Sequence, residues 1–149
     1  MASPLPERRP LSADPLGVMT QSPVLEFESS AFAVAAGEDE ETNPGIYGKA
    51  LAQWLAEQLR SAGFSAGDVI AEDFGWCVPV ASETHSLYVA CASTGERPDQ
   101  WRVFGFAAGG VMARLLGKDR RAESLAALYA ALRRCLESTP TILNLREEA

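Results

Sequence analysis

The sequence is poor in the residues that build metal centres and nucleophilic sites. It contains one histidine, His85, and three cysteines, Cys77, Cys91 and Cys135, with no Cys-x-x-Cys pair. No two potential ligands have a recognised zinc-binding spacing. Each cysteine lies in an apolar run, which is typical of a small buried side chain in a reducing compartment. We therefore expect no metal and no other cofactor.

Long apolar runs and positive charge are also scarce. No segment approaches the roughly 18 to 20 apolar residues of a membrane-spanning helix, and no apolar signal segment follows Arg8 and Arg9. The chain has 13 Lys and Arg against 20 Asp and Glu, a net charge of -7. Nucleic-acid binding needs clustered positive charge to displace counterions. We expect a cytoplasmic protein that binds neither membrane nor nucleic acid.

Composition and proline spacing divide the chain into a tail and one domain. The 149 residues are 47% hydrophobic, enough for a single domain with a core. Residues 1–22 carry prolines among small and polar residues, and prolines remove backbone donors and block helix formation. These prolines are Pro4, Pro6, Pro10 and Pro15. We therefore expect a flexible Pro-rich tail over 1–22 and a single α+β domain over 23–149.

Hydrophobic periodicity predicts two main helices. The first has a cap at Asn43-Pro44 and ends before Gly63, where Phe64 folds back on Leu59. The second begins at Asp119 or Ser124 and ends before Pro140. The apolar face of the first helix is formed by Tyr47, Leu51, Trp54, Leu55, Leu59 and Ala62.

Alternating and continuous apolar segments predict the strands. Residues 86–93 are apolar almost throughout, which predicts a strand covered, or nearly covered, on both faces. Residues 111–116 fit either a short helix or a strand. The order of elements predicts an α+β fold with a single mostly antiparallel sheet of four to six strands packed against two main helices. The other predicted strands are 24–36, 68–72, 76–82 and 101–107, with a short closing strand over 141–145.

The segment Glu72-Asp73-Phe74-Gly75-Trp76 joins two predicted strands. In a structural interpretation, Asp73 closes the turn through a bond to its own backbone, and Gly75 supplies a positive φ. Phe74 and Trp76 then pack on either side, with Trp76 against the first helix near Trp54 or Leu55. In a functional interpretation, the residues from Glu72 to Trp76 bind a partner.

Two other groups of residues are candidates for a site. The acidic loop of Glu38, Asp39, Glu40 and Glu41 is either a contact for a basic partner or a solvated loop. Glu72, Asp73 and His85 are the only candidates for a small enzyme or a ligand-binding domain. Adjacent side chains on a strand point to opposite faces, so Glu72 and Asp73 are a poor acid/base pair unless the chain bends there.

The pattern Leu51-x-x-Trp54-Leu55, then Gly63-Phe64 and Glu72-Asp73-Phe74-Gly75-Trp76, resembles small uncharacterised bacterial proteins with a helix followed by a Glu-Asp-aromatic-Gly-Trp turn. That resemblance covers about half of the chain and implies no activity or site. In size, acidity and architecture the chain is also similar to secretion chaperones and toxin-immunity proteins, which bind one protein partner.

We therefore expect a small acidic protein of the bacterial cytoplasm that acts as a non-catalytic protein-binding module, of the immunity-protein or secretion-chaperone kind. The alternative is the small enzyme or ligand-binding domain. The expected partner is another protein, and a homodimer is compatible with the sequence. The sequence names neither the partner nor the order of the strands.

Overall fold

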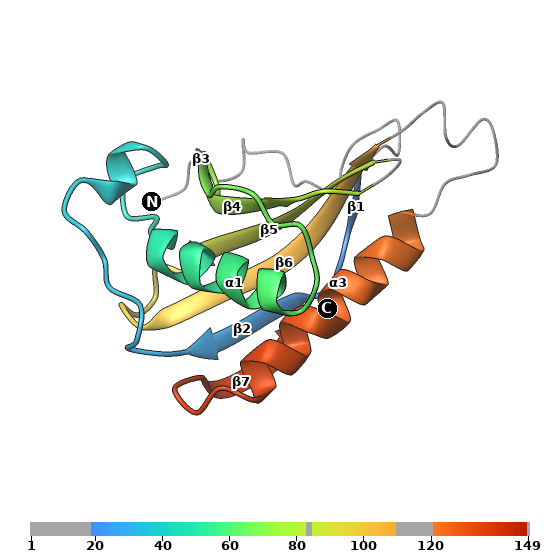
Figure 1. Cartoon of the computed structure of the whole chain (residues 1–149). Helices are drawn as coiled ribbons and strands as arrows, with labels where there is room; N and C mark the ends of the chain where they lie inside the picture. Colours follow the sequence, from blue (N-terminus) through green and yellow to red (C-terminus); the bar gives the residue numbers. More distant parts are fainter. Residues whose placement is uncertain (1–18, 83–84, 110–120, 149) are drawn as a thin grey trace.

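An antiparallel sheet of seven strands organises the chain (Figure 1). The computed structural model describes residues 19–82, 85–109 and 121–148. Along the sheet the strands follow the order β3-β4-β5-β6-β2-β7, and β1 pairs with β6 beyond the end of β2. The strands are β1 (Met19–Gln21), β2 (Val24–Glu28), β3 (Ile70–Glu72), β4 (Gly75–Val80), β5 (His85–Ser93), β6 (Gln100–Gly109) and β7 (Leu143–Glu148).

Both described α-helices, α1 (Lys49–Ser61) and α3 (Arg121–Glu137), pack on the same face of this sheet (Figure 1). The core between these helices and the sheet is a cluster of buried apolar side chains, to which the strands contribute alternate positions. Gly105 lets α3 approach closely, since a Cβ there would lie 3.1 Å from Leu125 Cδ1. The largest fully buried side chains of this core include Trp101, Phe27, Leu51, Leu55, Leu128 and Leu132.

The predicted fold class is confirmed, with one difference in size. An α+β fold with one antiparallel sheet and two helices is what forms, but the sheet has seven strands rather than four to six. The additional strand is β1, which Ser22 and Pro23 separate from β2. Strand β1 lies within the segment 1–22 that the sequence analysis assigned to the tail. The segment 111–116 lies outside the described residues.

The first helix ends as predicted but begins later. Gly63 has a φ of 98°, and the Phe64 N–H donates to the Leu59 carbonyl at 2.9 Å, which is the expected helix end. The cap predicted at Asn43-Pro44 is wrong, because α1 begins at Lys49 with Gly48 as its cap residue. Gly48 has a φ of 151°, which interrupts the helix before Lys49.

No helix among residues 19–82, 85–109 and 121–148 is long and apolar enough to cross a membrane.

Candidate functional site

The turn between β3 and β4 divides its side chains between solvent and core. Glu72 and Asp73 are exposed, Phe74 is half-buried and Trp76 is buried. The predicted bond from the Asp73 side chain to its own backbone is absent from the described residues. Instead the Asp73 carbonyl accepts a hydrogen bond from Asn43 Nδ2 at 2.9 Å. The turn is therefore held by a side chain from the segment that precedes α1.

Gly48 and Gly75 both allow the chain to pass close to the backbone carbonyl of Cys91. The φ of Gly75 is 147°, positive as the sequence predicted. A Cβ on Gly75 would lie 2.5 Å from the Cys91 oxygen. A Cβ on Gly48 would lie 2.7 Å from the same oxygen. Because the contact is with backbone, neither position accepts a side chain without movement of β5. Close packing against β5 therefore explains why a glycine stands between Phe74 and Trp76.

Trp76 packs into the core below the start of α1. Its side chain is 2% exposed, and Lys49 Nζ lies 5.2 Å from the ring centroid. It shares the core cluster with Leu55, and Trp54 lies at the edge of that cluster. The indole Nε1 is buried and has no hydrogen-bond partner among the described residues. These contacts assign Trp76 to the core and not to a partner-binding surface.

The acidic loop is not a uniform row of solvated carboxylates. It forms the 3-10 helix η3 (Glu38–Glu40), and Glu38 is 5% exposed. Glu38 Oε2 accepts from the backbone N–H groups of Gly48 at 2.8 Å and Lys49 at 2.9 Å. Glu38 therefore supplies the helix cap that Gly48 lacks.

Asp39 also turns toward its own chain. Its Oδ2 accepts from the Gly45 N–H at 2.8 Å and from the Tyr47 hydroxyl at 3.3 Å. The negative charge of Asp39 raises the pKa of Tyr47. Glu40 and Glu41 are exposed. Of the four acidic residues, these two therefore present their carboxylates to solvent.

The structure does not bring Glu72, Asp73 and His85 together. Strand β4 pairs with β5 so that Trp76 lies opposite Cys91, next to the turn that carries Glu72 and Asp73. His85 begins β5 and lies six residues before Cys91. At the rise of an antiparallel strand this separation is about 20 Å. The three residues proposed for an enzyme therefore form no common site.

The cysteines are unsuited to nucleophilic chemistry. Burial raises the pKa of Cys77 to about 12, with a smaller contribution from Glu72, and burial raises the pKa of Cys135 to about 11. Burial also raises the pKa of Cys91 well above its ordinary value. A reactive cysteine needs a lowered pKa. All three thiols are free, and they remain protonated at neutral pH.

The face of the sheet opposite the helices carries a cluster of four aromatic side chains, Phe74, Tyr88, Phe104 and Phe106, which we call the aromatic face. Tyr88 stacks on Phe106 with ring centroids 5.0 Å apart. Phe74 and Phe104 contact the same ring with centroids at 6.1 Å and 6.2 Å. Phe106 is 5% exposed, while its three neighbours are partly exposed. Neither described α-helix contributes to this cluster.

Two salt bridges lie at the border of the aromatic face. Glu26 on β2 accepts from Arg102 on β6 at 3.1 Å and from Arg146 on β7 at 3.0 Å. Arg102 is two residues from Phe104 on the same strand, so both side chains project from the same face of the sheet. The charged row therefore limits the apolar surface on the side of β2 and β7.

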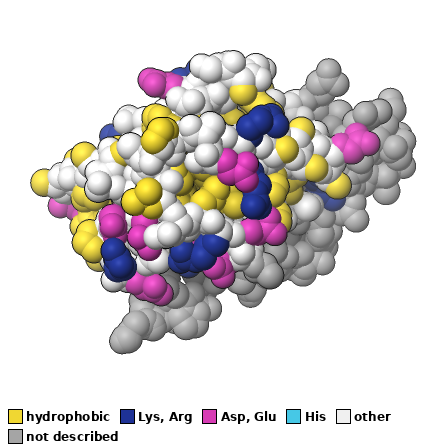
Figure 2. Space-filling model, turned by 90° about the horizontal axis from the view of Figure 1, so that it is seen from below, with side chains coloured by type: hydrophobic (Ala, Val, Ile, Leu, Met, Phe, Trp, Pro, Cys, Tyr) yellow, Lys and Arg dark blue, Asp and Glu magenta, His cyan; other side chains and the backbone are white. Residues whose placement is uncertain are grey.

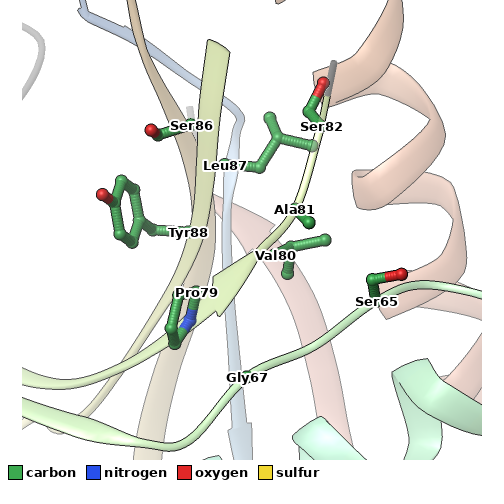
Figure 3. Close-up of a pocket in the computed structure, with 9 residues that line it drawn as sticks. All are labelled: Ser65, Gly67, Pro79, Val80, Ala81, Ser82, Ser86, Leu87 and Tyr88. Carbon is green, nitrogen blue, oxygen red and sulfur yellow. The ribbon is translucent and has the colours of Figure 1, made fainter. Parts of the chain in front are cut away.

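A pocket of about 280 Å³ adjoins the aromatic face at Tyr88 (Figure 3). Tyr88 and Ser86 project to one side of β5, and Leu87 projects to the other (Figure 3). Gly67 lies beside the Pro79 ring, since a Cβ there would lie 3.4 Å from Pro79 Cγ. Among the described residues, those that line the pocket carry hydroxyl groups and no Asp, Glu, Lys, Arg or His. The described part of the lining thus offers an apolar surface with hydroxyl groups.

The charges seen in Figure 2 do not form a field of one sign. Acidic and basic side chains lie next to one another, with hydrophobic atoms between them (Figure 2). Within the described part of the chain, no group of three or more His, Cys, Asp or Glu residues is placed to hold a metal ion. No family model, curated protein or solved structure matches the chain.

Of the residues singled out in the sequence, Phe74 alone belongs to the aromatic face. Sequence reasoning did not select Tyr88, Phe104 and Phe106. Their signal was the alternation along β5 and β6, in which aromatic residues occupy the positions between core residues. Tyr88 lies opposite Phe106 across these strands. Only the pairing of the strands brings the rings into one cluster.

Proposed function

We propose that the chain is a non-catalytic protein-binding module that presents its aromatic face to an extended apolar segment of another protein. The observation that carries this proposal is the cluster of partly exposed Phe74, Tyr88 and Phe104 around Phe106, on a sheet face to which neither described α-helix contributes. Aromatic residues are enriched at protein interfaces, where their large rigid surfaces bind at low entropic cost.

The pocket beside Tyr88 supports a partner of extended conformation. Its lining combines small residues such as Gly67 and Ala81 with the rings of Tyr88 and Pro79. A pocket bordered by a tyrosine ring and a proline ring suits proline-containing segments, which are already extended when free. The ion bridges of Glu26 can align polar groups of the partner at the border.

Size, acidity and location in the cell belong to the same proposal. A net charge of -7 is compatible with a basic or neutral partner. We place the protein in the bacterial cytoplasm, with secretion chaperones and immunity proteins as the functional class that it resembles. The exposed Glu40 and Glu41 are a second contact that the proposal allows.

Site-specific photo-crosslinking in the source cell tests the proposal. A photoreactive phenylalanine analogue replaces Phe104 on the aromatic face, and the same analogue replaces Gln53 on the exposed side of α1 as the matched control. We expect a defined protein to crosslink at position 104 and not at position 53. Identical products from both positions, or none from position 104, would contradict the proposal.

The crosslinked protein then allows a quantitative test. We expect Phe104→Ala to weaken its binding about tenfold or more, as loss of an interface aromatic does, and Gln53→Ala to leave binding unchanged. Isothermal titration calorimetry measures both. Equal affinities for the two variants would show that the aromatic face is not the binding surface.

A further inference from the structure

Carboxylates border the aromatic face on two sides, and they differ in their partners. Glu26, on the side of β2 and β7, is bound by Arg102 at 3.1 Å and by Arg146 at 3.0 Å. Glu72 and Asp73, in the turn between β3 and β4, are exposed. Among the described residues, no cation pairs with either of these two carboxylates. A cation brought by another molecule is therefore expected to bind at this turn and not at Glu26.

Strand register places Glu72 on the same face of the sheet as the aromatic rings. Ile70 pairs with Cys77, which is buried in the same cluster as the four rings, and Glu72 lies two residues further along β3. Side chains two residues apart on a strand project from the same face. Burial, and after it the negative charge of Glu72, raises the pKa of Cys77, as expected for neighbouring side chains. A ligand that covers the rings therefore passes within reach of the Glu72 carboxylate.

The other end of the aromatic face is the pocket, whose described lining residues include no charged side chain. Tyr88 belongs both to this pocket and to the aromatic face. Pro79 lies opposite Tyr88 on β4 and supplies a second ring. The pocket end therefore suits an uncharged residue such as proline, and the turn at the opposite end suits a cation.

The register of the strands also gives the spacing between these two ends. Glu72 pairs with Gly75, and Gly75 lies beside Ala92, since a Cβ on Gly75 would lie 2.9 Å from Ala92 Cβ. Along β5, Ala92 is six residues from Ser86 and four from Tyr88, which line the pocket. These separations are about 20 Å and about 13 Å. An extended segment, at about 3.1 to 3.3 Å per residue, covers such a distance in about four to six residues.

We propose that the partner's extended segment carries a lysine or arginine about four to six residues from the uncharged residue that enters the pocket, and that this cation binds Glu72 and Asp73. The inference rests on the proposed function, because it names the chemistry of the segment that the aromatic face binds. Apolar residues of the segment lie over Phe74 and Phe104, between the two ends. Exposed ion pairs are weak, so the cation sets the choice and the register of the partner more than the affinity.

Two synthetic peptides of equal composition test the spacing. The first has a central proline, alternating leucine and alanine on both sides, and two arginines at each end, about five residues from the proline. Its pattern is the same toward either end, so that both binding directions are tested together. In the second peptide the arginines flank the proline directly. Fluorescence anisotropy at low salt measures both, and we expect the natural chain to bind the first peptide about fivefold more tightly.

Two double substitutions with the same loss of charge locate the cation. Glu72→Gln with Asp73→Asn should remove most of the advantage of the first peptide. Glu57→Gln with Glu137→Gln, on the helices of the opposite face, should leave that advantage unchanged. All four side chains are exposed, and circular dichroism melts establish that both variants fold. Glu72→Lys with Asp73→Lys should reverse the preference, so that the first peptide binds more tightly when glutamates replace its arginines.

Equal affinity of the natural chain for the two peptides would overturn the inference, and so would the absence of binding to either peptide. Equal effects of the two double substitutions would also overturn it. A crosslinked partner at position 104 whose bound segment has no cation at this spacing would remove the inference and leave the proposed function in place. The expected peptide results, without a crosslinked partner in the cell, would do the reverse.

Discussion

The carboxylate of Glu38 accepts a hydrogen bond from the backbone N–H of Gly48 at 2.8 Å, across ten residues of chain. The same oxygen accepts from Lys49 N–H at 2.9 Å, and the other oxygen accepts from Ala35 N–H at 3.1 Å. One side chain thus fixes the loop before η3 and the first turn of α1. A residue that looked like part of an interaction loop is a component of the folded state.

We expect Glu38→Ala to reduce the free energy of unfolding by about 1 to 2 kcal/mol, because two helix N–H groups lose their acceptor. Urea denaturation measures the effect. Glu40→Ala is the control, since the Glu40 side chain is exposed and its replacement should change stability by no more than about 0.5 kcal/mol. Equal stability of the two variants would show that Glu38 is not a cap.

Gly75→Ala should destabilise the protein by several kcal/mol, because the added Cβ would lie 2.5 Å from the Cys91 oxygen. Gly45→Ala separates this clash from backbone strain, since Gly45 has a φ of 83° but no atom within 4 Å of an added Cβ. We expect Gly45→Ala to cost about 1 kcal/mol. Similar thermal melts for both variants would contradict the steric explanation.

Trp76→Ala should cost about 3 to 5 kcal/mol of stability, as large aromatic truncations in cores do. Trp76→Phe removes the buried indole N–H that has no partner among the described residues, and it keeps most of the apolar surface. Relief of the unpartnered donor offsets part of the lost packing, so we expect a much smaller cost for Phe. Denaturant melts compare the two, and equal losses would mean that the N–H is satisfied in solution.

Asn43→Ala should cost about 0.5 to 1 kcal/mol, since it removes the bond to the Asp73 carbonyl. Asp73→Ala should leave stability nearly unchanged, because the bond to Asp73 is made by its backbone. The bond from the Asp73 side chain that the sequence predicts would instead make Asp73→Ala cost about 1 kcal/mol. Chemical denaturation of both variants measures their free energies of unfolding. A larger loss of stability for Asp73→Ala than for Asn43→Ala would show that the Asp73 side chain, and not Asn43, holds the turn.

Stability should fall at alkaline pH partly through Cys77. Burial raises its pKa from 9.0 to about 12, so the unfolded thiol loses its proton first and the unfolded state gains stability as pH rises from 9 toward 12. Below pH 9 this contribution does not vary. Urea melts at pH 8 and pH 10 should differ less for Cys77→Ala than for the natural chain. An identical pH dependence would show that Cys77 titrates normally.

Much of the architecture was determined by local sequence. The stripe of Leu51, Leu55 and Leu59 predicted α1, and Gly63 with Phe64 predicted its end. The fold class followed from the order of such segments, because apolar period and turn chemistry are local properties. The start of α1 did not follow, since its cap is a side chain ten residues away from Gly48.

The tertiary structure alone decided which residues share a surface. Tyr88 and Phe106 are eighteen residues apart in the chain and stack because β5 and β6 pair in one register. The pairing of β4 with β5 places Glu72 and His85 toward opposite ends of β5. Sequence spacing shows to which face of its strand a side chain points, but register and the placement of helices decide whether that face is covered. The aromatic face is therefore a property of the folded sheet, formed from residues that are individually ordinary.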